Sequence, residues 1–401
     1  MLIKSLQLAN LLSYGPDHPP IELRPLNVLV GANGSGKSNF LEAISLLQAA
    51  PDQITRPVRD GGGIHDWLHQ TAGQTGARPD AWVEAVIANG HDAEYFRYRV
   101  AFNEMGGRFQ IQDEFLEFEN ARQGQTEPFF FYRWNGGHPL LKVVYWDPIE
   151  DKNIIQTHRL QRDSIQLDLS ILAQKRDADI YPALTSVARQ LTSIRQYRDW
   201  TFGRYATPRL AQKTDAPNDR LEPDCSNLGL MLNRLRMNGA ARRKLVAALR
   251  QVYEGIEDVD VSIQGGTVQV FLLEANGCAI PATRLSDGTL RYLALLTVLC
   301  DPDPPPLVTI EEPELGLHPD MLPVVADLLT DASERTQLIV TTHAPGLVDA
   351  LTDQPECILV CERGETGTTI ERLDAKQLQP WLEKYRLGQL WTSGQLGGNR
   401  W

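Results

Sequence analysis

The sequence lacks long apolar runs, has few cysteines and carries no excess of basic residues. No apolar run approaches the roughly 18 residues that cross a bilayer, so no membrane segment is predicted. The five cysteines show neither metal-site spacing nor an even disulfide framework, and the first six residues alternate like a strand rather than an export signal. These features favour a cytoplasmic protein. A formal net charge of −12 argues against a protein that coats nucleic acid with its whole surface.

Coiled coils and internal repeats are also missing. Proline and glycine interrupt the chain too often for a long heptad run, and no sequence period recurs. The length of 401 residues and the hydrophobic content of 42% suit one large domain or two interlocked ones.

A glycine-rich segment near the N-terminus carries the clearest functional pattern. Gly31 to Ser38 fit G-x-x-x-x-G-K-S, between the apolar run 26–30 and an apolar pattern of helical spacing. Glycines let backbone N–H groups turn toward phosphates, and a helix start directs its positive end at the same anion. We therefore expect this loop to bind ATP, with Lys37 on the β- and γ-phosphates, the Ser38 hydroxyl on Mg²⁺, and contacts from Asn33, Gly34, Ser35, Gly36, Lys37, Ser38 and Asn39. Ser13 and Tyr14, at a turn nearer the N-terminus, could contact adenine or ribose, but loop packing is the favoured role.

Alternating segments between residues 81 and 147 predict an antiparallel meander, separated by Asn-Gly and Gly-Gly turns. Its aromatic residues are expected in the core rather than on a base-stacking platform. Beyond Pro148 the pattern favours helices at 167–173, 181–198, 228–237 and 240–253, and then a hairpin over 259–273. Basic residues also collect in this part of the chain, and they fit either a nucleic-acid-facing surface or an ordinary solvated face. Those singled out are Arg195, Arg198, Arg204, Arg209, Arg234, Arg236, Arg242, Arg243, Lys244 and Arg250.

Two adjacent carboxylates follow the apolar strand predicted at 307–310. In phosphate-loop proteins one such carboxylate fixes the water shell of Mg²⁺, and a neighbour polarises the water that attacks the γ-phosphate. We assign Glu311 to the metal beside Ser38, and Glu312 to the water.

Four motifs occur in a fixed order: the phosphate loop, Leu-Ser-Asp-Gly-Thr at 285–289, Ile-Glu-Glu-Pro-Glu-Leu-Gly-Leu-His-Pro at 310–319, and Thr-Thr-His at 341–343. In this order they resemble the RecF/SMC-like branch of the ABC-type ATPases, within the AAA ATPases, which includes the ATPase parts of OLD-family nucleases. The resemblance implies an α/β P-loop NTPase of the ABC/SMC-head type, with an antiparallel β-meander subdomain and a helical lobe that carries the signature motif. The expected boundaries are 1–150 with 301–375 for the nucleotide-binding lobe, 151–300 for the helical lobe and 376–401 for a C-terminal tail.

The resemblance also implies roles for single residues. Ser286 and Gly288 would contact the γ-phosphate of a nucleotide bound to the opposite subunit, and Ser286 or Asp287 would cap the helix that follows. Asp287 stands where the family usually has glycine, so its charge must point away from the phosphate or be neutralised. His343 resembles the switch histidine that senses the γ-phosphate, and Gln174 is our candidate for the glutamine that links Mg²⁺ to the helical lobe.

Because the phosphate loop and the signature serve one nucleotide from two chains, the resemblance implies a homodimer with ATP between its subunits. Three roles stay open: a genome-defence switch that controls a separately encoded effector such as a nuclease, a RecF-like repair clamp that binds DNA, and a slowly hydrolysing scaffold. A nuclease domain in the chain itself is not expected, because too few residues follow His343. The tail is rich in tryptophan, with Trp381 and Tyr385 at helical spacing, and we hypothesise that it docks a partner or the other subunit.

Overall fold

The computed structural model describes residues 1–401 except 17, 71–77, 91–93, 136, 148–150 and 398–401. The chain forms two compact units. The first contains residues 1–24, 33–194 and 361–371, and the second contains 25–32, 195–360 and 372–401. No described helix is long and apolar enough to pass through a membrane.

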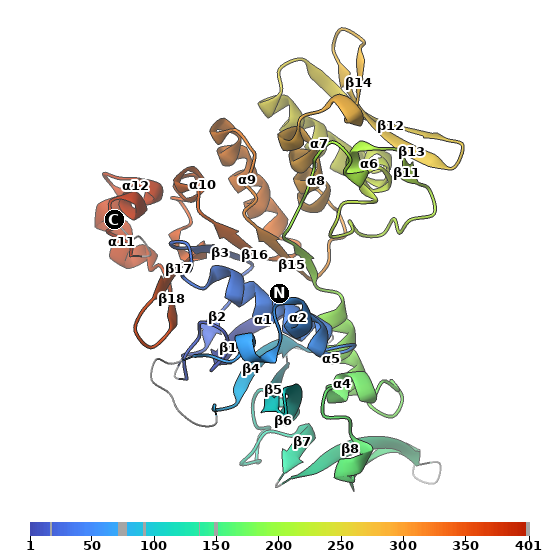
Figure 1. Ribbon diagram of the computed structural model, residues 1–401, viewed down its shortest axis with the longest axis vertical. Helices are drawn as coiled ribbons and strands as arrows, with labels where there is room; N and C mark the ends of the chain where they lie inside the picture. The colour runs from blue at the N-terminus through green and yellow to red at the C-terminus, as the bar shows by residue number, and fades with distance from the viewer. Residues whose placement is uncertain (17, 71–77, 91–93, 136, 148–150, 398–401) are drawn as a thin grey trace. The chain divides into compact units, whose positions relative to one another are not determined.

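The first unit is built on an eight-stranded sheet with the order β2-β1-β4-β5-β6-β7-β8-β9 (Figure 1). All of its described pairings are antiparallel, so the predicted meander is confirmed. The strands are β1 (Ile3–Ala9), β2 (Ile21–Glu22), β4 (Ala81–Ala88), β5 (Tyr95–Met105), β6 (Arg108–Phe118), β7 (Phe130–Asn135), β8 (His138–Asp147) and β9 (Lys152–Arg159). The helices are α1 (Lys37–Ala49), α2 (Thr55–Asp60), α3 (Ile64–Trp67), α4 (Ile171–Gln174), α5 (Pro182–Thr192) and the short 3-10 helix η1 (Arg162–Ser164).

A six-stranded sheet has the order β10-β15-β16-β3-β17-β18, and most of it belongs to the second unit, whereas nearly all of β18 and the end of β17 belong to the first. Its strands are β10 (Arg195–Tyr197), β15 (Leu307–Glu311), β16 (Gln337–Thr342), β3 (Leu26–Val30), β17 (Ile358–Arg363) and β18 (Thr368–Arg372). The strands β10, β15, β16, β3 and β17 pair in parallel, and β3 and β16 are buried along their whole length. Continuous apolar strands of this kind are typical of a parallel sheet covered on both faces.

Helices of the second unit pack on this sheet and on one another. The helix α9 (Leu322–Ser333) contacts β16 and β3, and α8 (Asp287–Leu299) and α10 (Pro345–Ala350) flank it (Figure 1). Nearly every residue of α8 from Thr289 onward is buried. The remaining elements are α6 (Leu228–Met237), α7 (Gly239–Val252), α11 (Ala375–Leu382), α12 (Leu387–Thr392), the 3-10 helices η2 (Thr207–Arg209), η3 (Ala282–Arg284), η4 (Pro319–Met321) and η5 (Pro355–Cys357), and a small sheet of β11 (Gln212–Lys213), β12 (Ile256–Gln264), β13 (Thr267–Glu274) and β14 (Ala279–Pro281).

Three segments differ from the expectation of helices beyond Pro148. The helix expected over 167–173 is limited to α4, Ile171–Gln174, and the other two segments contain strands. Residues Lys152–Arg159 form the strand β9, which pairs with β8. The helix expected over 181–198 ends at Thr192, because Arg195–Tyr197 pairs with β15 instead. In both cases pairing with a neighbouring strand overrides the local pattern.

The C-terminal tail packs on its own chain. Leu387 and Trp391 of α12 are buried, and the backbone N–H of Gly388 donates to Asp349 Oδ1 at 2.7 Å. Trp381 and Tyr385 stay about half exposed, with ring centroids 6.5 Å apart. Trp401 lies outside the described residues. Docking of a partner by the tail stays a prediction, which now concerns Trp381 and Tyr385.

Candidate functional site

The phosphate loop of the first unit leads directly into α1. Gly36 caps this helix with φ of 104°, in the left-handed region that favours glycine. A Cβ at Gly36 would lie 2.8 Å from Ser13 Oγ and would overlap the hydroxyl of Thr368. Glycine is therefore required here both by its backbone conformation and by its close neighbours.

A series of hydrogen-bonded polar side chains supports the phosphate loop. The amide of Asn39 donates to Ser13 Oγ at 2.8 Å, Ser13 Oγ lies 2.7 Å from Thr368 Oγ1, and Thr368 Oγ1 donates to the Ser35 carbonyl at 2.9 Å. The fully buried Tyr14 donates its hydroxyl to the Gly36 carbonyl at 3.0 Å. Loop packing by Ser13 and Tyr14 is thus confirmed.

Two polar groups of the loop are buried in a way that suits an anionic ligand. The side chain of Lys37 is almost entirely buried at the start of α1. Ser35 is also buried, and its hydroxyl has no hydrogen-bond partner within the described part of the chain. A buried hydroxyl without a partner costs free energy, and a bound phosphate oxygen would satisfy it.

A pocket of about 280 Å³ lies next to the polar side chains that support the loop. Thr368, which bonds to the loop, lines it together with residues of the turn after β1 and of the β17–β18 turn. The ring of His18 meets Tyr14 edge-on, with the centroids 5.3 Å apart.

The ends of three parallel strands bring the other predicted residues together in the second unit. Val30, the last residue of β3, is opposite Thr342 of β16, and Thr341 is opposite Glu311 of β15. The carboxyl ends of parallel strands meet at one edge of a sheet, where ligands of open α/β sheets bind. The phosphate loop begins at this edge with Gly31.

Glu312, at this edge, has an unusual backbone conformation. Its φ is 46°, a left-handed value that is uncommon for a residue with a side chain. The N–H of Glu312 donates to the Thr341 carbonyl at 3.0 Å, which holds the bend in place. Strained residues of this kind often occur at functional sites.

His343 lies next to Glu312. Nε2 of His343 is 3.3 Å from Oε1 of Glu312. The position of His343 is fixed by Glu314, whose Oε1 accepts from Thr342 Oγ1 at 2.6 Å and from the His343 N–H at 2.8 Å. Oε2 of Glu314 is buried and has no partner among the described residues. No role for Glu314 could be predicted from the sequence, because its partners are 28 and 29 residues away.

The proposed metal ligand Glu311 also has a protein partner. Nε of Arg198, just after β10, donates to Glu311 Oε2 at 2.8 Å, and both side chains are about one-fifth exposed. A cation bound by Glu311 would compete with Arg198 for this carboxylate.

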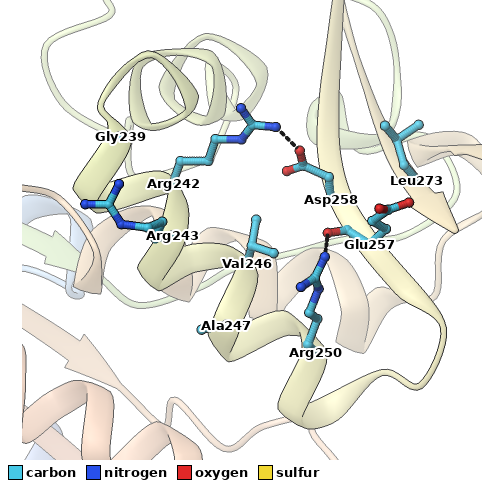
Figure 2. A pocket seen from close by; sticks show the side chains of 9 residues that line it. All are labelled: Gly239, Arg242, Arg243, Val246, Ala247, Arg250, Glu257, Asp258 and Leu273. Carbon is cyan, nitrogen blue, oxygen red and sulfur yellow. Dashed lines mark hydrogen bonds and ion pairs between the residues drawn. The ribbon is translucent and has the colours of Figure 1, made fainter. Parts of the chain in front are cut away.

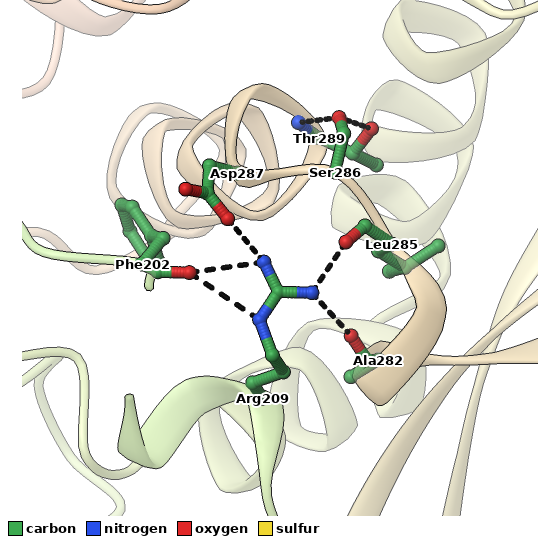
Figure 3. Close-up of polar contacts among 7 residues, drawn as sticks. All are labelled: Phe202, Arg209, Ala282, Leu285, Ser286, Asp287 and Thr289. Carbon is green, nitrogen blue, oxygen red and sulfur yellow. Dashed lines mark hydrogen bonds and ion pairs between the residues drawn. The ribbon is translucent and has the colours of Figure 1, made fainter. Parts of the chain in front are cut away.

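The signature segment has the predicted helix cap. Ser286 caps α8, and its Oγ accepts from the Thr289 N–H at 3.0 Å. Asp287 forms an ion pair with Arg209, so its charge is neutralised within the chain (Figure 3). A Cβ on Gly288 would overlap the carbonyl oxygen of Gly316, so only glycine fits against that loop.

Gln174 lies in α4 of the first unit, and its amide is engaged locally. Oε1 accepts from the Gln166 N–H at 2.9 Å, and Nε2 donates to the carbonyls of Gln166 and Leu169 at 3.0 and 2.8 Å. The amide would have to leave these partners to reach a metal. Its role at Mg²⁺ remains a prediction. No cluster of three metal-ligating side chains occurs in the parts of the chain that the structure describes.

The basic residues between 195 and 250 are largely neutralised by their own chain. Among the described residues, ion pairs with Asp or Glu are formed by Arg198, Arg209, Arg220, Arg234, Arg236, Arg242 and Lys244. A pocket of about 560 Å³ lies between α7 and the start of β12 (Figure 2). There Arg242 pairs with Asp258, and Arg250 donates to the Glu257 carbonyl at 2.9 Å. These contacts favour the interpretation that the basic residues form an ordinary solvated surface.

The fold and the phosphate loop together define a P-loop protein with the fold of an SMC head. Residues 26–349 match the family model described as "AAA domain, putative AbiEii toxin, Type IV TA system". The match covers most of the chain, which therefore belongs to this family. A search of curated proteins returns no match.

Three solved structures illustrate the fold. An Smc head bound to the winged-helix domain of ScpA is 17% identical with a TM-score of 0.56, and 94% of this chain and 99% of that one are covered. A Pyrococcus furiosus Smc head bound to the C-terminal domain of ScpA gives 15% identity, a TM-score of 0.56 and coverage of 96% and 99%. A Pyrococcus yayanosii Smc head with a coiled coil and joint is 13% identical with a TM-score of 0.50, and 96% of this chain and 99% of that one are covered. The predicted ABC/SMC-head fold is confirmed.

Proposed function

We propose that this protein is a Mg²⁺-dependent ATPase that two copies of the chain complete around bound ATP. The observation that carries the proposal is the sheet edge where Glu311, Thr342 and the start of the phosphate loop come together. Membership of the AAA-domain family supports nucleotide binding.

ATP would bind along the loop from Asn33 to Asn39, with its base and ribose near the pocket that Thr368 lines. Lys37, the first residue of α1, would pair with the β- and γ-phosphates. The hydroxyl of Ser38 and the carboxylate of Glu311 are hard oxygen ligands, which suit Mg²⁺ beside phosphate oxygens. When bound, Mg²⁺ neutralises charge on the β- and γ-phosphates.

The chemical step we assign to Glu312 and His343 is the attack of water on the γ-phosphate. The Glu312 carboxylate accepts a hydrogen bond from the water and orients it. His343, 3.3 Å from that carboxylate, would contact the γ-phosphate and couple its presence to the position of Glu312. The strained backbone of Glu312 supports this role.

In the signature, Ser286 and Gly288 would contact the nucleotide of the partner subunit, and Asp287 lies between them with its charge paired to Arg209. Ser286 supplies a hydroxyl and the first turn of α8 at the γ-phosphate, in the arrangement that favours anions at helix starts. Mixing two inactive variants tests this. A Ser286→Arg chain keeps its phosphate loop, and a Lys37→Ala chain keeps its signature, so a mixed dimer contains one complete site. We expect the mixture to regain ATPase activity, and no recovery would contradict use in trans.

For the cellular role we propose a genome-defence switch that acts on a separate effector such as a nuclease. The family description, which names a toxin of a type IV toxin–antitoxin system, favours it. The alternative of a DNA clamp is less favoured, because the basic residues of the helical lobe are mostly ion-paired. Salt-dependent binding of duplex DNA by the purified protein would reverse this preference.

A further inference from the structure

Arg209 makes an unusually complete set of hydrogen bonds around the signature segment (Figure 3). Its Nε and Nη2 donate to the Phe202 carbonyl at 3.3 and 2.9 Å. Its Nη1 donates to the Ala282 carbonyl at 3.3 Å and to the Leu285 carbonyl. The second N–H of Nη2 donates to Asp287 Oδ1. All five N–H donors of the guanidinium are therefore used.

This arrangement requires arginine rather than a positive charge alone. The five donors of a guanidinium lie in one rigid plane, whereas lysine has three donors on a compact ammonium group. Arg209 thus ties together three separate parts of the chain: the segment around Phe202, the turn at 282–285 and the first residue of α8.

The burial of the two charged partners differs strongly. The Arg209 side chain is 8% exposed, whereas that of Asp287 is 68% exposed. Asp287 therefore adds a negative charge to the accessible part of the signature segment, next to Ser286 and Gly288. A phosphate that approaches this segment would be repelled by an uncompensated carboxylate. The guanidinium behind Asp287 compensates it.

We propose that Arg209 is the positioning residue of the signature segment: it fixes the backbone of 285–288 and neutralises Asp287, so that this segment accepts the γ-phosphate of the partner's ATP. This inference rests on the proposed function, because it assumes that the segment meets a nucleotide. Arg209 itself stays behind the segment and acts through Leu285 and Asp287.

The test uses the full chain with Glu312→Gln, in which we expect ATP to hold the dimer together. Sedimentation equilibrium with ATP and Mg²⁺ gives the dimer dissociation constant of this parent and of three variants: Arg209→Gln, Asp287→Asn, and the two combined. We expect Arg209→Gln to weaken the dimer on the order of tenfold or more. Asp287→Asn should dimerise at least as tightly as the parent, and the double variant should regain much of the loss.

Three controls separate the explanations. Arg236→Gln removes an arginine that pairs with Asp260 at 2.7 Å in the same lobe, and it should leave dimerisation unchanged. Binding of a fluorescent ATP analogue to the monomer should be equal in parent and Arg209→Gln, because it uses the chain's own phosphate loop. Circular dichroism checks that each variant is folded.

Several results would overturn the inference. One is a dimer dissociation constant of Arg209→Gln equal to that of the parent. Another is a double variant that dimerises no more tightly than Arg209→Gln, which would mean that Arg209 only supports the backbone. If Asp287→Asn no longer dimerises, the charge argument is wrong. This result does not depend on whether the Arg209 variants fold. If the parent itself fails to dimerise with ATP, the proposed function fails instead.

Discussion

Nε2 of His343 lies 3.3 Å from Oε1 of Glu312, and the two residues follow the ends of neighbouring parallel strands. The sheet sets this distance, because β15 and β16 are paired along their length up to Glu311 and Thr341. The carboxylate to which we assign the attacking water is thereby linked to the histidine that we propose senses the γ-phosphate.

Replacing His343 by glutamine should slow hydrolysis without removing nucleotide binding. We expect kcat to fall on the order of 10²-fold, the usual size for loss of a catalytic acid–base or positioning group, with little change in KM for ATP. Steady-state phosphate release measures both constants. The exposed His138 gives a matched control, His138→Gln. Unchanged kcat in His343→Gln would remove the histidine from the reaction.

Glu314 should be required to hold the end of β16. Glu314→Ala leaves the Thr342 hydroxyl and the His343 N–H without their acceptor, and we expect a loss of about 1–3 kcal/mol in the free energy of unfolding. Glu314→Gln keeps an oxygen at Oε1 and should recover most of the stability and of kcat. Urea denaturation and phosphate release test this. Two variants of equal stability would show that the hydrogen bonds at Oε1 do not matter.

Removal of the Thr368 hydroxyl should weaken the support of the phosphate loop. Thr368→Ala breaks the contacts with Ser13 Oγ and the Ser35 carbonyl, each worth about 1 kcal/mol. We expect weaker binding of ATP in titration calorimetry and a lower free energy of unfolding. Thr214→Ala, at an exposed position that does not line this pocket, is the control. The prediction fails if both variants bind ATP as tightly as the parent protein.

Glu114 predicts a pH dependence of stability in the first unit. It is buried in β6 and accepts from the Tyr98 hydroxyl at 2.7 Å and from the Ile171 N–H at 2.9 Å. Burial raises the pKa of Glu114 from 4.5 to about 8. Since the folded state then holds the proton more tightly than the unfolded state, stability falls as the pH rises from about 4.5 to 8, by up to about 1.4 kcal/mol per pH unit.

The variant Glu114→Gln should remove this contribution, because the amide does not titrate. The difference in the free energy of unfolding between the two proteins, measured by urea denaturation from pH 5 to pH 8.5, should change steadily with pH. A constant difference over this range would mean that Glu114 is ionised to the same extent in both states.

Much of the site could be predicted because its pattern is local. The phosphate loop and the helix cap at Ser286 depend on residues within a few positions of one another, and the structure forms both. The positions of Glu312 and His343 after apolar strands could also be predicted, whereas the contact between them is a finding of the structure.

The contacts that orient these residues could not be predicted, because they span long stretches of chain. Arg209 and Asp287 are 78 residues apart, and Arg198 and Glu311 are 113 apart. One sequence offers no signal that selects Arg209 from the other basic residues between 195 and 250. The strand β9 was missed for the same reason, because its partner β8 and not its own composition makes it a strand.

The most direct test of the central claim is the mass of the Glu312→Gln protein in solution. Sedimentation velocity with saturating ATP and Mg²⁺, compared with ADP and with no nucleotide, separates the 44.9 kDa monomer from a dimer. We predict a dimer with ATP only, and its loss when Lys37→Ala or Ser286→Arg is added. A protein that stays monomeric with ATP, although it binds the nucleotide, would contradict the account.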